Sequence, residues 1–173
     1  MAKRKAGAPT RPRVARSLEL DDLDWKLLAR LQQDARISTA DLAREFSLSA
    51  PGVQKRVRRL EEKGVVLRHA TVLNREAVGL DLLCFILIML AHHRADSVQR
   101  FQAGVHAMPE VLECHYLTGE FDCVVKAVVS NHDELQRFLE RLMKLGAVDR
   151  LRTAIVLREI KSTTNLPLRG PGP

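Results

Sequence analysis

The sequence has few cysteines, and they lack the spacings that cysteine chemistry requires. Cys84, Cys114 and Cys123 are an odd number in 173 residues, no two form a CxxC pair, and each lies in an apolar stretch. A disulfide framework or a zinc site would need paired or clustered ligands. The three residues are therefore predicted to be free, buried thiols in a reducing cytoplasm.

Long apolar runs are also missing. The longest covers residues 82–91, ten residues against the roughly twenty that a membrane-spanning helix requires. The opening MAKRKAGAPTRPR is charged and has no apolar core, unlike a secretory signal. We expect a soluble, cytoplasmic protein with no membrane partner.

Residue groups typical of catalysis or metal binding are missing as well. The six histidines are scattered, and none lies at motif spacing from a cysteine or an acid. Adjacent His92 and His93 fall at the end of a predicted strand, where neighbouring side chains face opposite sides. We expect no catalytic residue, no metal and no cofactor.

Positive charge is present but unevenly distributed. The formal charge is +7; residues 1–17 hold six basic residues and no acid, residues 18–75 hold eleven and nine, and residues 76–173 hold eleven and twelve. This division favours a front part that faces nucleic acid and a back part with another task. Residues 1–17 are predicted to be a disordered basic tail, either merely solvated or adding phosphate contacts without base specificity.

The front part begins with two predicted helices. Leucines at helical spacing follow two aspartates, which predicts a first helix over residues 21–33. Ser38 is predicted to cap a short second helix that runs to about residue 46, with Asp41 returning to the cap residue.

A third helix, basic and tightly joined to the second, is predicted over residues 49–63. Ser49 is its expected cap, Pro51 lies in the first turn where its missing N–H costs nothing, and Gly64 stops it. Two short helices joined by so tight a turn form a helix-turn-helix pattern. Residues 65–73 alternate loosely and predict two short strands, a wing beside the helix.

The third helix divides into a core stripe and an outward face. Val53, Val57 and Leu60 share one side and are predicted to be buried. Outward, Gln54 can read adenine and Lys55 or Arg58 guanine, as a helix inserted in the major groove does. Two further arginines lie round the helix, better placed for phosphates. The predicted DNA-contacting residues are Ser38, Thr39, Ser49, Pro51, Gly52, Gln54, Lys55, Arg56, Arg58 and Arg59. A solvated basic face is the alternative.

The back part predicts a ferredoxin-like arrangement, a four-stranded antiparallel sheet with both helices on one face. The predicted order is a strand at 82–91, a helix at 96–108, strands at 111–118 and 123–129, a helix at 131–144 and a strand at 148–160. Because the strands are apolar on both faces, the bare sheet face must be buried, and a twofold-related copy is the expected cover. Such a homodimer would present two helices to a pseudo-palindromic operator in double-stranded DNA.

The fold class is thus α+β, an N-terminal winged helix-turn-helix followed by a C-terminal ferredoxin-like βαββαβ sandwich. The predicted segments are the tail at 1–17, the DNA-binding domain at 18–75, a linker at 76–81, an effector-binding and oligomerisation domain at 82–168, and a flexible end at 169–173.

Specific residues in both halves resemble the leucine-responsive regulatory protein and asparagine regulator (Lrp/AsnC) family, from about residue 20 to residue 168. The resemblance is carried by Leu20-Asp21 with Asp24, Leu31-Gln32-Gln33-Asp34-Ala35-Arg36-Ile37-Ser38, Leu48-Ser49, Arg56-Val57, Arg59-Leu60-Glu61, Gly64-Val65, Thr118-Gly119, Phe121-Asp122, Val156-Leu157 and Lys161. It implies a transcriptional regulator that assembles as dimers and often as octamers of four dimers.

The resemblance also implies a small-molecule effector, commonly an amino acid, bound between effector domains. The family's Gly-x-x-Asp turn maps onto Gly119 and Asp122, where a carboxylate can meet an α-ammonium group. The residues expected to line the pocket are Tyr116, Thr118, Gly119, Glu120, Phe121, Asp122 and Thr153. In the alternative reading, Gly119 only allows the hairpin and Asp122 caps it. The ending at 160–168 resembles a branch that responds to leucine or methionine, the first candidates.

Two departures from the family affect these expectations. Cys123 stands where an aromatic residue often follows the Asp of the turn, which bears on pocket shape. Ala50-Pro51-Gly52 replaces a frequent Ser-Pro opening of the recognition helix, which bears on the DNA sequence read.

Two other functions fit parts of the sequence. Haem-biosynthesis decarboxylases share this two-domain architecture, but an enzyme would not need the basic outward face of the third helix. An architectural DNA-binding protein without a ligand differs only at Asp122 and its neighbours.

Overall fold

The computed structural model describes residues 19–91 and 95–168. They form two compact units, one of residues 19–72 together with 162–168 and one within residues 73–161. The predicted basic tail at 1–17, the pair His92–His93 and the predicted flexible end at 169–173 lie outside the described residues.

The first unit is built on three helices, α1 (Asp22–Gln33), α2 (Thr39–Glu45) and α3 (Ala50–Glu62). Leu27 and Val53 are fully buried in its core, with Leu42 and Ala43 beside them, and Val57 packs against the edge. Leu60 is fully buried as well, so the predicted core stripe of the third helix is confirmed. The stripe fixes which side of α3 remains outside.

Side-chain caps set the starts of these helices. Ser49 accepts a hydrogen bond from the Gly52 backbone N–H at 3.2 Å, as predicted. Ser38 accepts from the Asp41 N–H at 3.0 Å, but the Asp41 carboxylate returns to the Ser38 hydroxyl at 2.6 Å rather than to its backbone. The Asp41 carboxylate accepts from the side-chain hydroxyl of Ser38, so the reciprocal half of the predicted capping box is not formed at this helix.

The predicted wing is wrong, because residues 65–73 contain no strand. Val65 and Val66 still donate their N–H groups to the carbonyl oxygen of Leu60, and Val72 and Leu73 are exposed. A two-stranded ribbon needs a tight turn, usually with Gly, Asn or Asp at its centre. Residues 65–73 contain none of these, so the segment lacks the turn signal that such a ribbon usually has.

A C-terminal segment completes the first unit. The side-chain amide of Gln32 on α1 donates to the carbonyl oxygen of Leu166 at 3.3 Å and accepts from the Leu166 N–H at 2.7 Å. Because the Gln32 side chain bonds both the N–H and the carbonyl oxygen of Leu166, it holds the C-terminal segment in one register along α1.

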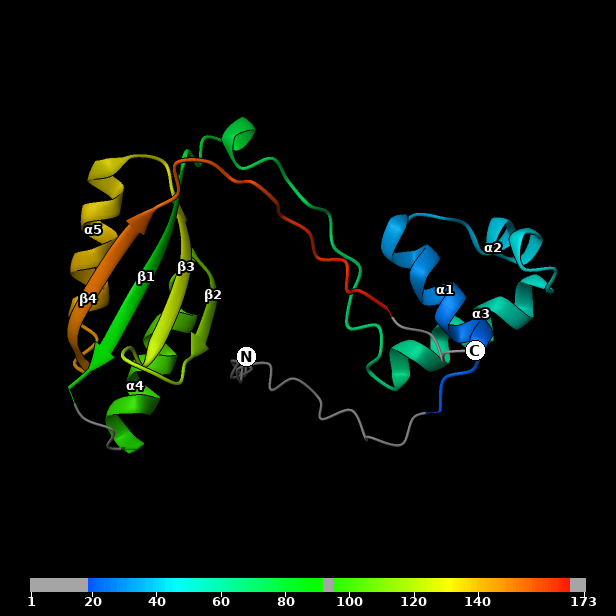
Figure 1. Ribbon diagram of the computed structural model, residues 1–173, viewed down its shortest axis with the longest axis horizontal. Coiled ribbons are helices and arrows are strands. Elements are labelled where there is room, and N and C mark those ends of the chain that lie inside the picture. The colour runs from blue at the N-terminus through cyan, green and yellow to red at the C-terminus, as the bar shows by residue number, and fades with distance from the viewer. Residues whose placement is uncertain (1–18, 92–94, 169–173) are drawn as a thin grey trace, which may run out of the picture. The chain divides into compact units, whose positions relative to one another are not determined.

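The second unit confirms the predicted β-α-β-β-α-β order. Its elements are the short 3₁₀ turn η1 (Glu76–Val78), β1 (Leu82–Leu90), α4 (Ala95–His106), β2 (Val111–Tyr116), β3 (Cys123–Val129), α5 (His132–Met143) and β4 (Val148–Ile155). The strands lie in the order β2-β3-β1-β4, and every neighbouring pair is antiparallel. Both helices cover one face of this sheet (Figure 1).

The two faces of the sheet differ in what covers them. Ile86 pairs with Val125, and both are fully buried with Phe138 of α5 on the helix-covered face. The next pair, Leu87 with Val124, points to the other face, where both side chains are only half-buried. This helix-free surface, which we call the open face, is as apolar along β1 as the covered one.

The last strand is shorter than predicted, and one cysteine is less buried. Pairing of β4 ends at Ile155 instead of residue 160, because β1 begins at Leu82 and offers no backbone beyond the bond from the Val156 N–H to Leu83. Cys114 is exposed rather than buried, since β2 is an edge strand.

Candidate nucleic-acid interface and effector turn

The outward face of α3 carries the predicted base-reading residues. Gln54, Lys55 and Arg58 are exposed, and the core stripe holds the helix from the opposite side. Arg58 forms an ion pair with Glu62 one turn later, at 2.8 Å. With the Arg58 side chain 76% exposed, such a pair contributes little and leaves the guanidinium able to change partner.

The other predicted DNA-contacting residues lie at the starts of α2 and α3. Thr39 and Pro51 are exposed, and Gly52 is half-buried. A Cβ at Gly52 would lie 3.0 Å from the Ser49 hydroxyl, so this glycine leaves room for the cap. Ser38 and Ser49 are exposed, but the hydroxyl oxygen of each already accepts the backbone N–H hydrogen bond that caps its helix. Their direct contact with DNA stays a prediction.

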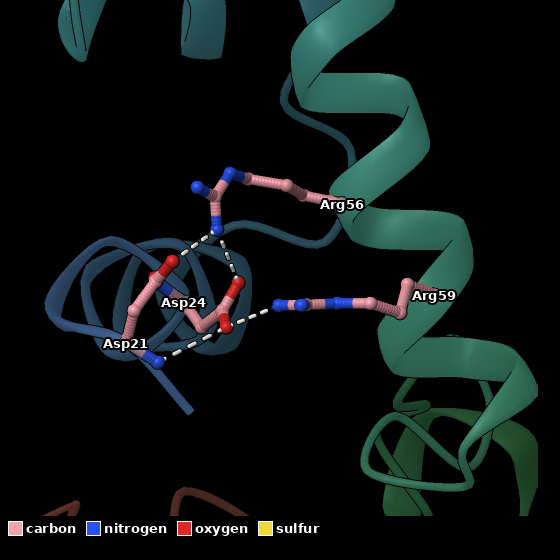
Figure 2. Close-up of polar contacts among 4 residues, drawn as sticks. All are labelled: Asp21, Asp24, Arg56 and Arg59. Carbon is pink, nitrogen blue, oxygen red and sulfur yellow. Dashed lines mark hydrogen bonds and ion pairs between the residues drawn. The ribbon is translucent and has the colours of Figure 1, made fainter. Parts of the chain in front are cut away.

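Arg56 and Arg59 have partners inside the domain. Arg56 Nη1 lies 2.6 Å from Asp21 Oδ2 and 3.0 Å from Asp24 Oδ1, and Arg59 Nη2 pairs with Asp24 Oδ2 (Figure 2). The Asp24 side chain is 0% exposed. Both arginines are thus paired within the domain, and these ion pairs compete with the phosphate contacts predicted for them.

The structural role of Asp24 was not identified from the sequence, where Asp24 entered only as one of the residues that carry the family resemblance, although a signal for that role exists. Asp21 and Asp24 form a reciprocal cap: the Asp24 N–H donates to Asp21 Oδ1 at 2.8 Å, and the Asp21 N–H donates to Asp24 Oδ2 at 3.2 Å. An acid three residues after a capping acid, together with two basic residues three apart on a later helix, is the pattern to look for.

The ion pairs among Asp21, Asp24, Arg56 and Arg59 predict a contribution to stability that is lost in acid. Hydrogen bonds from the Arg56 guanidinium and then from the Asp24 N–H hold the pKa of the Asp21 carboxyl below its ordinary 3.8. A lowered folded-state pKa means that the contribution is complete above 3.8 and is lost as the pH falls through the folded value. We expect Asp21→Asn, which still caps a helix, to lower the free energy of unfolding at neutral pH.

The measurement is urea unfolding of both proteins from about pH 7 down to about pH 2. The difference between the parent and Asp21→Asn should shrink on the acid side and vanish where Asp21 is protonated in both states. A difference that stays constant over the whole range would show that the Asp21 charge contributes nothing.

The predicted effector turn is held rigidly to the end of β1. The Asp122 N–H donates to the Ile88 carbonyl oxygen at 2.9 Å, the Asp122 carbonyl oxygen accepts from Leu117 at 2.8 Å, and its carboxylate accepts from the Leu90 N–H at 2.7 Å. Gly119 has a φ of 126°, a conformation open mainly to glycine. Asp122 thus has a structural task that both readings of the turn allow.

The structure brings only some of the predicted pocket residues together. Phe121 lies beneath the guanidinium of Arg152, 5.5 Å from the ring centroid, and Arg152 pairs in the sheet with Leu87 of the open face. Thr153 pairs with Ile86 and therefore points to the helix-covered side, where its hydroxyl is buried without a partner in the described chain. Arg152 was not among the residues that the sequence predicted near the turn.

The remaining predicted residues of the effector site lie along the same hairpin. Tyr116, Thr118 and Glu120 are exposed. The pKa of the Tyr116 phenol is raised above its ordinary value, and the largest cause is the partial burial of that group. A groove of about 840 Å³ lies elsewhere, between α5 and β4, and contains none of the predicted effector residues.

The described ranges offer no metal site and no membrane-spanning helix. No group of three or more His, Cys, Asp or Glu side chains there is placed to hold a metal ion. None of the helices in those ranges is both long enough and apolar enough to cross a membrane.

Comparison with known proteins matches both units. The AsnC-type helix-turn-helix domain matches residues 20–61, and the Lrp/AsnC ligand binding domain matches residues 83–166. The leucine-responsive regulatory protein of Haemophilus influenzae is 35% identical over 89% of this chain and 93% of its own length. The DNA-binding transcriptional activator DecR of Escherichia coli is 35% identical over 86% of this chain and 99% of its own.

Solved structures give the same match. A transcriptional regulator of Neisseria meningitidis, crystallised as a complex with L-methionine, superposes with a TM-score of 0.82 and 34% identity. The match covers 86% of this chain and 97% of the other.

Proposed function

Because this chain belongs to the Lrp/AsnC family, and is therefore a DNA-binding transcriptional regulator and not an enzyme, we propose that it reads a pseudo-palindromic operator under the control of an amino-acid effector. The observation that carries the proposal is the outward face of α3, with Gln54, Lys55 and Arg58 exposed on a helix fixed by a buried stripe. Acting on DNA, it would work in the cytoplasm.

The proposed base contacts follow from side-chain chemistry. Gln54 offers the amide pair that matches adenine, and Lys55 and Arg58 offer donors that match guanine. Around them, Ser38, Thr39, Ser49 and the first turn of α3 are proposed to lie against the phosphate backbone, where exposed hydroxyls and N–H groups position a protein without reading sequence.

A dimer is the proposed working unit. Phe85, Leu87, Met89 and Val124 are exposed or half-buried on the open face of the sheet, and Phe85 is 39% exposed. Contiguous apolar side chains at the centre with charged residues around them are typical of a self-complementary interface. Assembly of four such dimers into an octamer is proposed by analogy with the family.

The proposed effector is an amino acid, with leucine or methionine the first candidates. This rests on the family, on the relatives named for their response to leucine and on the L-methionine bound to the Neisseria regulator. The proposed contacts come from the turn at Gly119 and Asp122 and from its neighbours Tyr116, Thr118, Glu120, Phe121 and Thr153. A pocket completed by a neighbouring subunit would explain why one chain brings only some of these together.

Thermal unfolding in the presence of each of the twenty amino acids tests the effector. Binding at a hundred times the dissociation constant should add about 2.7 kcal/mol of stability and raise the melting temperature. Asp122→Asn should remove that shift, whereas Glu159→Gln, an equal charge change at an exposed site, should keep it. No shift with any amino acid would favour a ligand-independent architectural DNA-binding protein instead.

A further inference from the structure

Asp24 accepts more hydrogen bonds than any other side chain described in the first unit. Its Oδ1 accepts from Arg56 at 3.0 Å, and its Oδ2 accepts from Arg59 and from the Asp21 N–H. Asp24 is the one charged residue among the described ranges whose side chain is completely buried. A buried carboxylate persists only when its charge and its lone pairs are matched, and here both oxygens are occupied.

The two arginines lie on the side of α3 that faces α1. They are three residues apart, so they project from successive turns toward the same carboxylate (Figure 2). Rolling α3 about its axis, or sliding it by one residue, would move both guanidinium groups away from Asp24. Apolar packing has no preferred direction, whereas hydrogen bonds weaken steeply with angle. The ion pairs therefore add an orientation that Val53 and Leu60 alone would not fix.

The contacts with Asp24 also determine which arginines of α3 face outward. The Arg56 and Arg59 side chains are 32% and 43% exposed, and Arg58 between them is 76% exposed and points away from Asp24. A guanidinium released from Asp24 would be a mobile donor suited to any phosphate. Phosphate contacts raise affinity for every sequence alike, and only base contacts discriminate.

We propose that Asp24 is a positioning residue for DNA reading: it holds Arg56 and Arg59 on the protein side of the recognition helix, which fixes the direction of Gln54, Lys55 and Arg58 and keeps two cations out of non-selective phosphate contacts. This inference rests on DNA binding through α3. A merely structural Asp24 would affect all duplexes equally, so the ratio of specific to non-specific affinity separates the two roles.

The first test is Asp24→Asn, with Asp22→Asn as the matched control. Asp22 lies in the same first turn, is exposed, and carries the same charge. The unaltered protein first selects a duplex from a random library, and a scrambled duplex of equal composition serves as the non-specific probe. Affinities for both duplexes are measured over a range of salt concentrations, with circular dichroism to show that each variant is folded.

For Asp24→Asn we expect affinity for the selected duplex to fall about tenfold or more, while affinity for the scrambled duplex stays level or rises. The salt dependence on the scrambled duplex should steepen by up to about 0.9 for each guanidinium that reaches a phosphate. Asp22→Asn should change both affinities by the same small factor. Equal loss on both duplexes with an unchanged salt dependence, or behaviour like that of Asp22→Asn, would overturn the proposal.

Arg59→Gln decides the matter if Asp24→Asn does not fold, because Arg59 is the more exposed arginine and Asp24 keeps Arg56. We expect weaker binding of the selected duplex with no change in salt dependence. A salt dependence shallower by about 0.9 would mean that Arg59 contacts phosphate in the unaltered protein, and that also overturns the proposal, as does unchanged binding. If the unaltered protein selected no duplex at all, DNA reading itself would fail, which is a distinct result.

Discussion

The double substitution Lys55→Ala and Arg58→Ala is expected to reduce affinity for the selected operator by about 10²-fold or more. A well-formed side-chain contact to a base edge discriminates by about 1–3 kcal/mol, and every 1.4 kcal/mol is about tenfold in affinity. Both side chains are exposed on α3 and contribute nothing to its buried stripe. Unfolding by urea should therefore be nearly unchanged, and the loss should lie in binding.

The matched control removes one lysine and one arginine elsewhere, at Lys26 on α1 and Arg137 on α5, both exposed. Both double variants lose the same net charge, so any general electrostatic effect is shared. Binding is measured by titration of the selected and scrambled duplexes at one salt concentration. If the double variant of α3 kept its preference for the selected duplex, base reading would have to be assigned to other residues.

Leu87→Arg is expected to turn the proposed dimer into a monomer and to lower affinity for a duplex with two half-sites by about 10²- to 10⁴-fold. Leu87 is half-buried at the centre of the open face, and its neighbour in β4 is Arg152. A twofold interface repeats the substitution, so two new cations would be desolvated beside two existing ones. In the monomer the new side chain reaches water, and the fold should persist.

Leu87→Arg is compared with the unaltered protein in two measurements and with one control variant. Light scattering at micromolar concentration reports the mass, and titration with one-half-site and two-half-site duplexes separates reading by a single helix from pairing of two. Gln99→Arg adds the same charge on the exposed side of α4 and should remain dimeric. A dimeric Leu87→Arg with undiminished affinity would exclude the open face as the interface.

The helices were predictable because their signals are local. Ser38, Ser49 and Gly64 act within three or four residues of themselves, and the stripe at Val53 and Leu60 repeats with the period of the helix. Helix starts and stops could therefore be assigned from short stretches of sequence, and the structure confirms them to within a few residues.

The features that sequence reasoning missed depend on partners far away in the chain. Asp24 looks like any acid in a first helical turn until Arg56 and Arg59, more than thirty residues later, are brought against it. The wing failed for the opposite reason: residues 65–73 have the alternation of a strand but no partner in the described chain. Alternation describes a strand's faces and says nothing about its edges.

The effector turn lies between these cases. The hairpin around Gly119 was predictable from its residues, and the anchoring of Asp122 to Leu90 was not, because it requires knowing that β3 lies beside β1. Arg152 was missed since nothing in β4 marks a cation that will stack on a ring two strands away.

The contact between Gln32 and Leu166 has a consequence for the order in which the protein is made. The two residues are 134 positions apart, so the ribosome has synthesised nearly the whole chain before α1 can bind this segment. The three-helix core uses residues from the first third of the chain and can form early, but its last contact waits until translation is almost complete. A nascent chain would thus display α3 before its first unit is finished.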